Sequence, residues 1–376
     1  MTMTDQNDED RGILRDSVAR LMTDHYGFRD RARHAASPEG WSTAMWDRYA
    51  ELGLPAIGLP EAHGGIGGPI ETMIVMEAMG RALALEPLLA STVLGGTAIA
   101  RAGTDAQCAA ILPRVAEGTL RLAFAHAEPG AGRDPCWVET AARPDGEAWL
   151  LDGRKSAVLH GDSAGLLVIS ARIAGAPSAR DGLGLFLVEP DATGLTRRRG
   201  RLQDGTSIAD LDLAGVTAER LGQGEAWPAI EAAEQAGLAA LLAHAVGAID
   251  GALALTVDYL KTRKQFGRLI GSNQALQHRA ADMLVAAEEA RSMALLAAHS
   301  LSEPDAEQRA DDLSRARLVV ARCGRFVGQQ AVQLHGGIGM TEDYAAGHYL
   351  RTLTVTAQLF GDAEWHLERL AQRLSL

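Results

Sequence analysis

The distribution of proline is the feature that most constrains the fold of this 376-residue chain. After Pro228 only Pro304 interrupts the sequence, and because proline breaks a helix interior, long helices can run through residues 226–376. Apolar residues recur there at helical spacing, at Leu238, Leu241, Leu242, Ala245 and Ile249. We expect four to six helices packed as a bundle.

Residues 119–225 have a different pattern. Short apolar runs lie between clusters of Gly, Pro and Asp, at 120–124, 165–170, 185–188 and, in alternation with Asp, 209–213. Runs of this length and spacing predict short strands. We expect them to form a compact antiparallel barrel or sandwich.

Residues 1–118 are compatible with helices, one of them over Glu71–Ala84, preceded by a loop rich in Gly and Pro at 59–69. The sequence therefore predicts a mainly α protein with a central β domain. Its three parts are an N-terminal helical domain (1–118), a middle antiparallel β-barrel domain (119–225) and a C-terminal helical bundle domain (226–376).

Composition excludes several classes of protein. The net charge of -12 excludes a general nucleic-acid binder, which needs clustered Lys and Arg. Three cysteines without a CxxC pair argue against a metal cage or a disulfide framework. The N-terminus lacks a secretory signal, and the apolar stretch Ala236–Ile249, interrupted by His244, is too short to cross a bilayer. We expect a cytoplasmic protein without a membrane span, with Ala and Leu filling an interior that has few aromatics.

Two glycine clusters, His63–Gly68 and His335–Gly339, invite a search for nucleotide binding. Neither follows a strand and neither precedes a Walker lysine, so a plain loop is the simpler interpretation of each. A glycine cluster beside a helix start can nevertheless admit a phosphate, because its backbone N–H groups are unblocked.

The segment Asp258–Gly267 ends a helical pattern in a basic cluster. It can be a charged helix end that complements the helix dipole. Alternatively it is an anion site, in which Arg263 reaches a pyrophosphate and Phe266 covers a ring.

Histidine offers no catalytic motif, because neither HExxH nor a nucleophile elbow occurs. His126, His160 and His244 lie in apolar stretches, which is typical of satisfied core residues.

Five segments resemble, in the same order, those of the acyl-CoA dehydrogenase family. They are Trp46–Gly68, Phe124–Asp134, Trp149–Lys155, Thr262–Gly267 with Gln274, and Gln333–Gly339. The second is similar to the signature Thr-Glu-Pro-Gly-Ala-Gly-Ser-Asp and the fourth to Glu-Arg-x-x-Phe-Gly. The resemblance extends from about residue 40 to the carboxyl end.

The resemblance implies a tetrameric flavoprotein that desaturates acyl-CoA between Cα and Cβ. A carboxylate takes the α proton, FAD takes the β hydrogen as hydride, and an electron-transfer flavoprotein reoxidises the FAD. It also implies that five residues reach across a subunit boundary to the neighbour's FAD: Arg263, Phe266, Gln274, Gln333 and Gly337.

Other positions depart from the family pattern. The residues expected to serve the flavin ring are replaced by Ala127, Arg133, Ala157 and Leu159. Of these only Arg133 can repeat a missing side-chain hydrogen bond.

The usual positions of the catalytic Glu are occupied by Phe360 and, for a minority of the family, by Gly237. Neither side chain can accept a proton. Asp362 and Glu234 are close enough in sequence to be substitutes.

The Phe-Gly-Asp variant at residues 360–362 most resembles the small subunit of pimeloyl-CoA-type dehydrogenases, which form α2β2 tetramers. Three hypotheses follow. The chain is a dehydrogenase subunit that acts with a paralogous partner, a self-sufficient homotetramer with an unconventional base, or a scaffold that has lost flavin.

Overall fold

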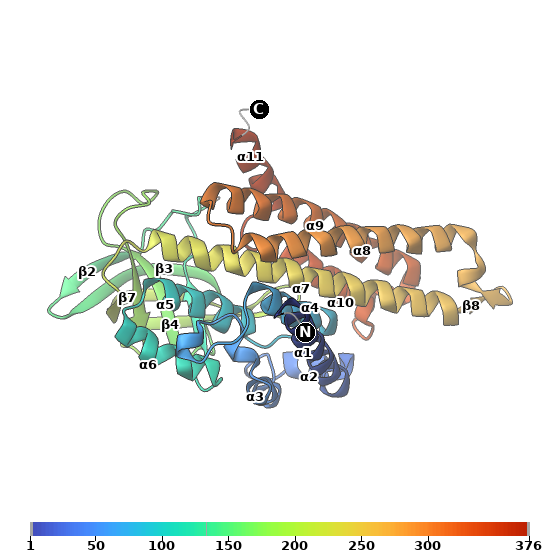
Figure 1. Cartoon of the computed structure of the whole chain (residues 1–376), viewed down its shortest axis with the longest axis horizontal. Coiled ribbons are helices and arrows are strands. Elements are labelled where there is room, and N and C mark those ends of the chain that lie inside the picture. The colour runs from blue at the N-terminus through green and yellow to red at the C-terminus, as the bar shows by residue number, and fades with distance from the viewer. Residues whose placement is uncertain (1–2, 133, 374–376) are drawn as a thin grey trace. The chain divides into compact units, whose positions relative to one another are not determined.

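The computed structural model describes residues 3–132 and 134–373, with helices at both ends of the sequence and strands in its middle (Figure 1). The first helices are α1 (Met3–His25), α2 (Phe28–Ala35), α3 (Thr43–Glu51), α4 (Pro69–Ala82), α5 (Thr97–Ala102) and α6 (Asp105–Ala116), with a π-helix at Leu89–Gly96. Helix α4 confirms the helix predicted over Glu71–Ala84.

The strands are β1 (Leu122–Ala125), β2 (Ala141–Asp145), β3 (Ala148–Leu159), β4 (Leu166–Arg172), β5 (Leu183–Val188), β6 (Leu195–Arg201) and β7 (Ser207–Leu221). In the described part of the chain they are followed by α7 (Trp227–Thr262), α8 (Gln274–Ser300), α9 (Ala306–His335), α10 (Ala345–Thr356) and α11 (Ala363–Arg373). These five helices confirm the four to six expected from the proline distribution.

The chain forms two compact units. The first contains the residues up to Ala32, then Pro69–Ala84 and the residues from Leu238 onward; the second contains Arg33–Gly68 and Leu85–Gly237. Packing thus groups the segments differently from their order in the chain. The predicted boundaries near residues 118 and 225 stay a prediction.

Small side chains fill the core of the first unit. On α8 the buried face includes Ala286, Ala290, Ala294 and Ala297. The residues of α9 in the same cluster include Ala316, Val320, Cys323, Val327 and Ala331. Both sets recur every three or four residues and so occupy one face of their helix. The expectation that alanine carries much of the interior is confirmed here.

Helices α4 and α7 touch through their backbones. A Cβ added to Gly247 would lie 1.8 Å from the Glu77 carbonyl oxygen, and one added to Gly80 would lie 1.9 Å from the His244 carbonyl oxygen. No side chain fits at either place, because real carbon–oxygen contacts are much longer. The crossing of the two helices therefore depends on glycine at both positions.

Helix α7 is long and apolar enough to cross a membrane by its length and composition alone, although the stretch Ala236–Ile249 within it is too short. Yet 72% of its most apolar 18-residue window is buried inside the protein. Such burial is typical of a core helix.

The closed antiparallel barrel expected for the middle region is not what the second unit forms. Its seven strands make one sheet, in which β1 runs parallel to β4, and β2 meets β4 through the single pair Ala141 and Arg172. The remaining pairs are antiparallel. All seven residues of β4 are buried. Apolar runs report burial but not strand direction, which is why the sequence could not reveal the parallel pairs.

Replacing Gly247 with Ala tests the helix crossing. We expect G247A to destabilise the fold by roughly 3 kcal/mol, because the methyl group must push α4 away. The matched control is Gly12 in α1, where an added Cβ meets nothing within 4 Å. There the same substitution should stabilise the protein by about 0.5–1 kcal/mol through helix propensity. Urea unfolding of both variants measures the difference, and equal midpoints would refute the backbone contact.

Candidate cofactor site

The basic end of α7 continues into a short hairpin, with β8 (Lys264–Gln265) paired to β9 (Arg268–Leu269). Its turn residues, Phe266 and Gly267, both have positive φ angles of 52° and 78°. Such a two-residue turn matches the twist of a hairpin. The Ile270 N–H donates to the Arg263 carbonyl at 2.9 Å and closes the base of the hairpin. Phe266 is fully exposed at the tip.

The late glycine motif begins where α9 ends. Gly336 has a φ of 65° and opens a 3-10 helix, η5 (Gly336–Met340). A Cβ added at Gly336 or Gly337 would meet nothing within 4 Å, so both backbones are approachable. Gln333, in the last turn of α9, is exposed.

An aromatic contact brings these two segments together. The buried ring of His335 lies 4.5 Å from the Tyr259 ring and 5.0 Å from the Tyr344 ring. Tyr259 is one helical turn before Arg263, and the Arg263 N–H donates to its carbonyl at 2.9 Å. The end of α7 and the end of α9 are therefore packed side by side.

Every predicted cofactor-binding residue is exposed on the first unit: Arg263, Phe266, Gln274, Gln333 and Gly337. Gln274 is the first residue of α8. An exposed guanidinium, unblocked glycine backbones and an exposed aromatic ring are the groups that a coenzyme with a diphosphate and a ring system requires. The residues present fit such a coenzyme.

At the first predicted base position, Phe360 follows α10 with a φ of 58°. The buried guanidinium of Arg317 donates to the carbonyls of Thr356 (2.6 Å), Leu359 (2.7 Å) and Gly361 (2.8 Å). Burial lowers the pKa of Arg317 to about 10, so it stays charged at neutral pH. Arg317 thus holds the turn that carries Phe360. Its position in an apolar helical pattern, where charge is unexpected, was the only signal of this role in the sequence.

Asp362 has a structural task. Its Oδ1 accepts a hydrogen bond at 2.8 Å from the Trp365 N–H in the first turn of α11. A carboxylate at this place satisfies a free donor at the helix start. Because this hydrogen bond occupies one carboxylate oxygen, Asp362 is a weaker candidate for the catalytic base.

Glu234 lies on α7, one turn before the buried Gly237. Its side chain is partly buried, and burial together with the nearby Glu231 raises its pKa to about 7. A carboxylate with this pKa is suited to accept a proton near neutral pH.

On the predicted flavin-ring side, in the second unit, the structure brings Ala127 and Ala157 together. The Ser156 N–H donates to the Ala127 carbonyl at 2.9 Å. Both alanines are exposed, and Ala157 lies in a β-bulge with a φ of 50°. Leu159 is buried nearby on β3, whereas Arg133 is outside the described residues. The described positions on this side offer only backbone groups for hydrogen bonding.

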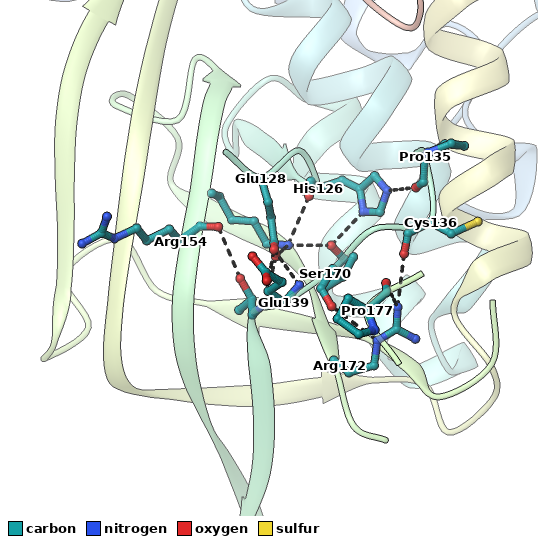
Figure 2. A network of polar contacts seen from close by, with 12 residues as sticks. His126, Glu128, Pro135, Cys136, Glu139, Arg154, Ser170, Arg172 and Pro177 are labelled. Atoms are coloured by element: carbon teal, nitrogen blue, oxygen red, sulfur yellow. Dashed lines mark hydrogen bonds and ion pairs between the residues drawn. The ribbon is translucent and has the colours of Figure 1, made fainter. Parts of the chain in front are cut away.

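The sequence neighbours of Ala127, His126 and Glu128, belong to a buried polar network that sequence reasoning missed (Figure 2). The Lys155 ammonium donates to Glu128 Oε1 (2.7 Å), Ser170 Oγ (3.0 Å) and the His126 carbonyl (3.1 Å). These contacts use all three donors of the lysine. Burial lowers the pKa of Lys155 to about 8, against the opposing effect of Glu128, so it is charged at neutral pH.

Glu128 links the network to the entrance of β2. Its carboxylate accepts from the backbone N–H groups of Glu139 (2.6 Å) and Thr140 (3.1 Å). Burial alone would raise the pKa of Glu128, but the Lys155 charge and these hydrogen bonds hold it below its usual value. The pair is therefore an ion pair in the interior of the sheet unit.

His126 confirms the prediction of a satisfied core histidine. Its Nε2 is 2.8 Å from the Pro135 carbonyl and its Nδ1 is 2.8 Å from Ser170 Oγ. Burial and the adjacent Lys155 lower its pKa to about 4. His160 and His244 are also largely buried, but within the described chain their Nδ1 atoms have no hydrogen-bond partner.

The fold and these exposed groups together define a class: a mainly helical protein with a sheet unit and exposed residues that fit a diphosphate-bearing coenzyme. The chain belongs to the acyl-CoA dehydrogenase family. The N-terminal, middle and C-terminal domains of that family match residues 8–119, 123–220 and 227–375. The resemblance of the motifs is thereby confirmed at the level of the family.

Similarity to individual proteins supports the same family assignment. Acyl-CoA dehydrogenase FadE12 of Mycobacterium tuberculosis is 33% identical over 358 residues, covering 89% of this chain and 88% of that protein. Acryloyl-CoA reductase (NADH) of Anaerotignum propionicum is 30% identical, covering 87% and 85%. A solved structure described as the Tcur3481-Tcur3483 steroid ACAD G363A variant is 32% identical, with a TM-score of 0.87 over 98% of both chains. The protein is an oxidoreductase that acts on acyl-CoA, and FAD is its cofactor.

Replacing Arg317 with Met tests whether its hydrogen bonds to backbone carbonyls stabilise the turn that carries Phe360. We expect a loss of at least about 3 kcal/mol in unfolding free energy, because buried carbonyl acceptors lose their donor. Arg315 is the matched control on the same helix, since its side chain is 46% exposed and pairs with Asp312 at the surface. R315M should change stability by only about 0–1 kcal/mol. Similar urea midpoints for both variants would rule out this stabilisation.

Proposed function

We propose that this chain is one subunit of an FAD-dependent acyl-CoA dehydrogenase that desaturates acyl-CoA between Cα and Cβ together with a paralogous partner chain. The observation that carries the proposal is an asymmetry between two surfaces. The groups that can bind another molecule's coenzyme are exposed, whereas Ala127, Ala157 and Leu159, at described positions that would serve a flavin ring of the chain's own, lack polar side chains.

The exposed surface supports a contact with another subunit. Phe266 is fully exposed at the hairpin tip, and Met340, at the end of η5, is 76% exposed. Large apolar side chains in such positions gain stability only when another molecule covers them. Arg263 beside them supplies the charge that a diphosphate needs.

The length of α7 also supports a division between two sites. From Gly237 to its end at Thr262 the helix is continuous, and a rise of 1.5 Å per residue separates these points by roughly 38 Å. A base at the start of α7 and a diphosphate at its end are too far apart to serve one coenzyme. The base for a coenzyme bound at the Arg263 end must therefore come from a part of the assembly other than the start of this α7 helix.

In the assembly, each element of this chain has a defined role. Arg263 pairs with the coenzyme diphosphate, Gly336 and Gly337 approach it with their backbones, and Phe266 covers a ring. When bound, FAD supplies the acceptor for the β hydrogen. The carboxylate that takes the α proton comes from the partner chain, because Phe360 and Gly237 cannot accept a proton.

The finer details of the proposal follow from the family resemblance. We infer an α2β2 tetramer in which this chain corresponds to the small subunit of pimeloyl-CoA-type enzymes. We also infer a cytoplasmic location, a role in β-oxidation of fatty-acid type, and reoxidation by an electron-transfer flavoprotein. The relative described as a steroid ACAD makes a steroid-derived acyl-CoA the first substrate to test.

Co-purification with paralogous dehydrogenase chains tests the proposal. We expect a stable complex with a flavin absorption spectrum and acyl-CoA oxidation, whereas the chain alone should lack turnover. Full flavin loading and turnover by the chain alone would refute the dependence on a partner. Absence of flavin in every assembly would instead favour a scaffold.

Replacing Arg263 with Met tests the diphosphate contact. In the two-chain assembly we expect FAD to bind roughly 10–100-fold more weakly, because a charge-assisted hydrogen bond is lost. Lys261, two residues earlier and also exposed, is the matched control, and K261M should leave FAD affinity unchanged. Flavin released on dilution measures both effects. Equal release from the two variants would exclude Arg263 from the site.

A second candidate is a self-sufficient homotetramer in which Glu234 is the base, which its pKa of about 7 favours over Asp362. In the two-chain assembly we expect E234Q to leave turnover unchanged. A loss of roughly 100-fold or more would assign the proton transfer to Glu234. In that case the wild-type rate should also fall below pH 7, because the carboxylate becomes protonated there. The control is D362N, which should lower stability alone.

A further inference from the structure

Three aromatic rings lie under the exposed cofactor surface of the first unit. The rings of Tyr259, His335 and Tyr344 are mutually packed, with centroids 4.5 to 6.4 Å apart. Tyr259 is near the end of α7, His335 is the last residue of α9, and Tyr344 is the N-cap of α10. One cluster thus joins three helix ends that are far apart in sequence.

The cluster is continuous with both binding segments. On one side, the Tyr259 carbonyl accepts from the Arg263 N–H, and the Arg263 carbonyl accepts from the Ile270 N–H, each at 2.9 Å. On the other side, His335 directly precedes the open backbone of Gly336 and Gly337. A displacement of the His335 imidazole would therefore change the distance between Arg263 and the Gly336–Gly337 backbone.

The ring of His335 is itself fixed. It is only 4% exposed, and its Nδ1 lies 2.7 Å from the Ala331 carbonyl, to which it donates. Burial lowers the pKa of His335 below its usual value, so the ring is uncharged at neutral pH. It therefore adds no charge to an anion site and acts through its shape and its stacking.

We propose that His335 is a positioning residue that, with Tyr259 and Tyr344, sets the spacing between Arg263 and the Gly336–Gly337 backbone. This inference rests on the proposed function in that the spacing serves a coenzyme diphosphate bound by Arg263. Pairs of aromatic rings add stability beyond their buried area, and their preferred geometries make the spacing specific.

The first test needs no coenzyme. Hydrogen exchange is measured on the free chain at the Arg263 and Ile270 amides, in the wild type and in H335F and H335L. Leucine fills space without an aromatic face, so we expect H335L to accelerate exchange of both amides roughly tenfold. Phenylalanine keeps the ring and should stay within about twofold of the wild type.

The second test uses the two-chain assembly. We expect FAD to dissociate roughly tenfold faster from H335L and at the wild-type rate from H335F. His299, exposed in the last turn of α8, is the matched control, and H299L should change neither measurement. If H335L does not fold, Y344L removes only the partly buried outer ring and should show the same pattern.

The outcomes are distinct. Wild-type exchange and FAD release in H335L would overturn the inference, and so would equal effects of H335F and H335L. An assembly of wild-type chains that holds no flavin would overturn the proposed function, while the exchange measurement still decides whether the rings set the spacing.

Discussion

The uninterrupted hydrogen bonding of α7 over Trp227–Thr262 is the constraint on which the rest of this structure depends. Within the first unit, from Leu238 to Thr262, the side chains along this helix keep fixed directions and distances. Its glycine contact with α4 sets one crossing, and its last turn carries Tyr259 and the hairpin of Arg263. A proline anywhere in its interior would disconnect these elements.

Much of this arrangement was accessible from the sequence, and the exceptions share a physical cause. Proline spacing and apolar periodicity located the long helices, whereas the assignment of Arg263, Gln333 and Gly337 to a cofactor stays a prediction from motif order. The parallel pairing of β1 with β4 was missed because a buried run looks the same in either direction. Arg317 and Lys155 were missed because buried charges are stabilised by partners that are distant in the chain. Asp362 stays a candidate base, and its helix-capping contact could not be read from the sequence.

The surface around Arg263 and the predicted flavin-ring side around Ala127 differ in the groups that they expose. Arg263 and the Gly336–Gly337 backbone adjoin the packed rings of Tyr259 and His335, so contacts within this chain support their position. On the flavin-ring side the supporting network of Glu128 and Lys155 is intact, although the outward positions Ala127 and Ala157 carry only methyl groups. The ion pair is therefore held by contacts inside the sheet unit and does not involve the side chains at these outward positions.

The buried pair of Lys155 and Glu128 is much costlier to substitute than the exposed positions around it. Removing either partner alone strands a charge in the interior at a cost of several kcal/mol, whereas exposed alanines can be exchanged almost freely. Single substitutions can therefore change the exposed positions Ala127 and Ala157 readily. They cannot remove one member of the buried pair without a large loss of stability. The paired charges thus fix the interior of the sheet unit, while the exposed positions around it stay free to vary.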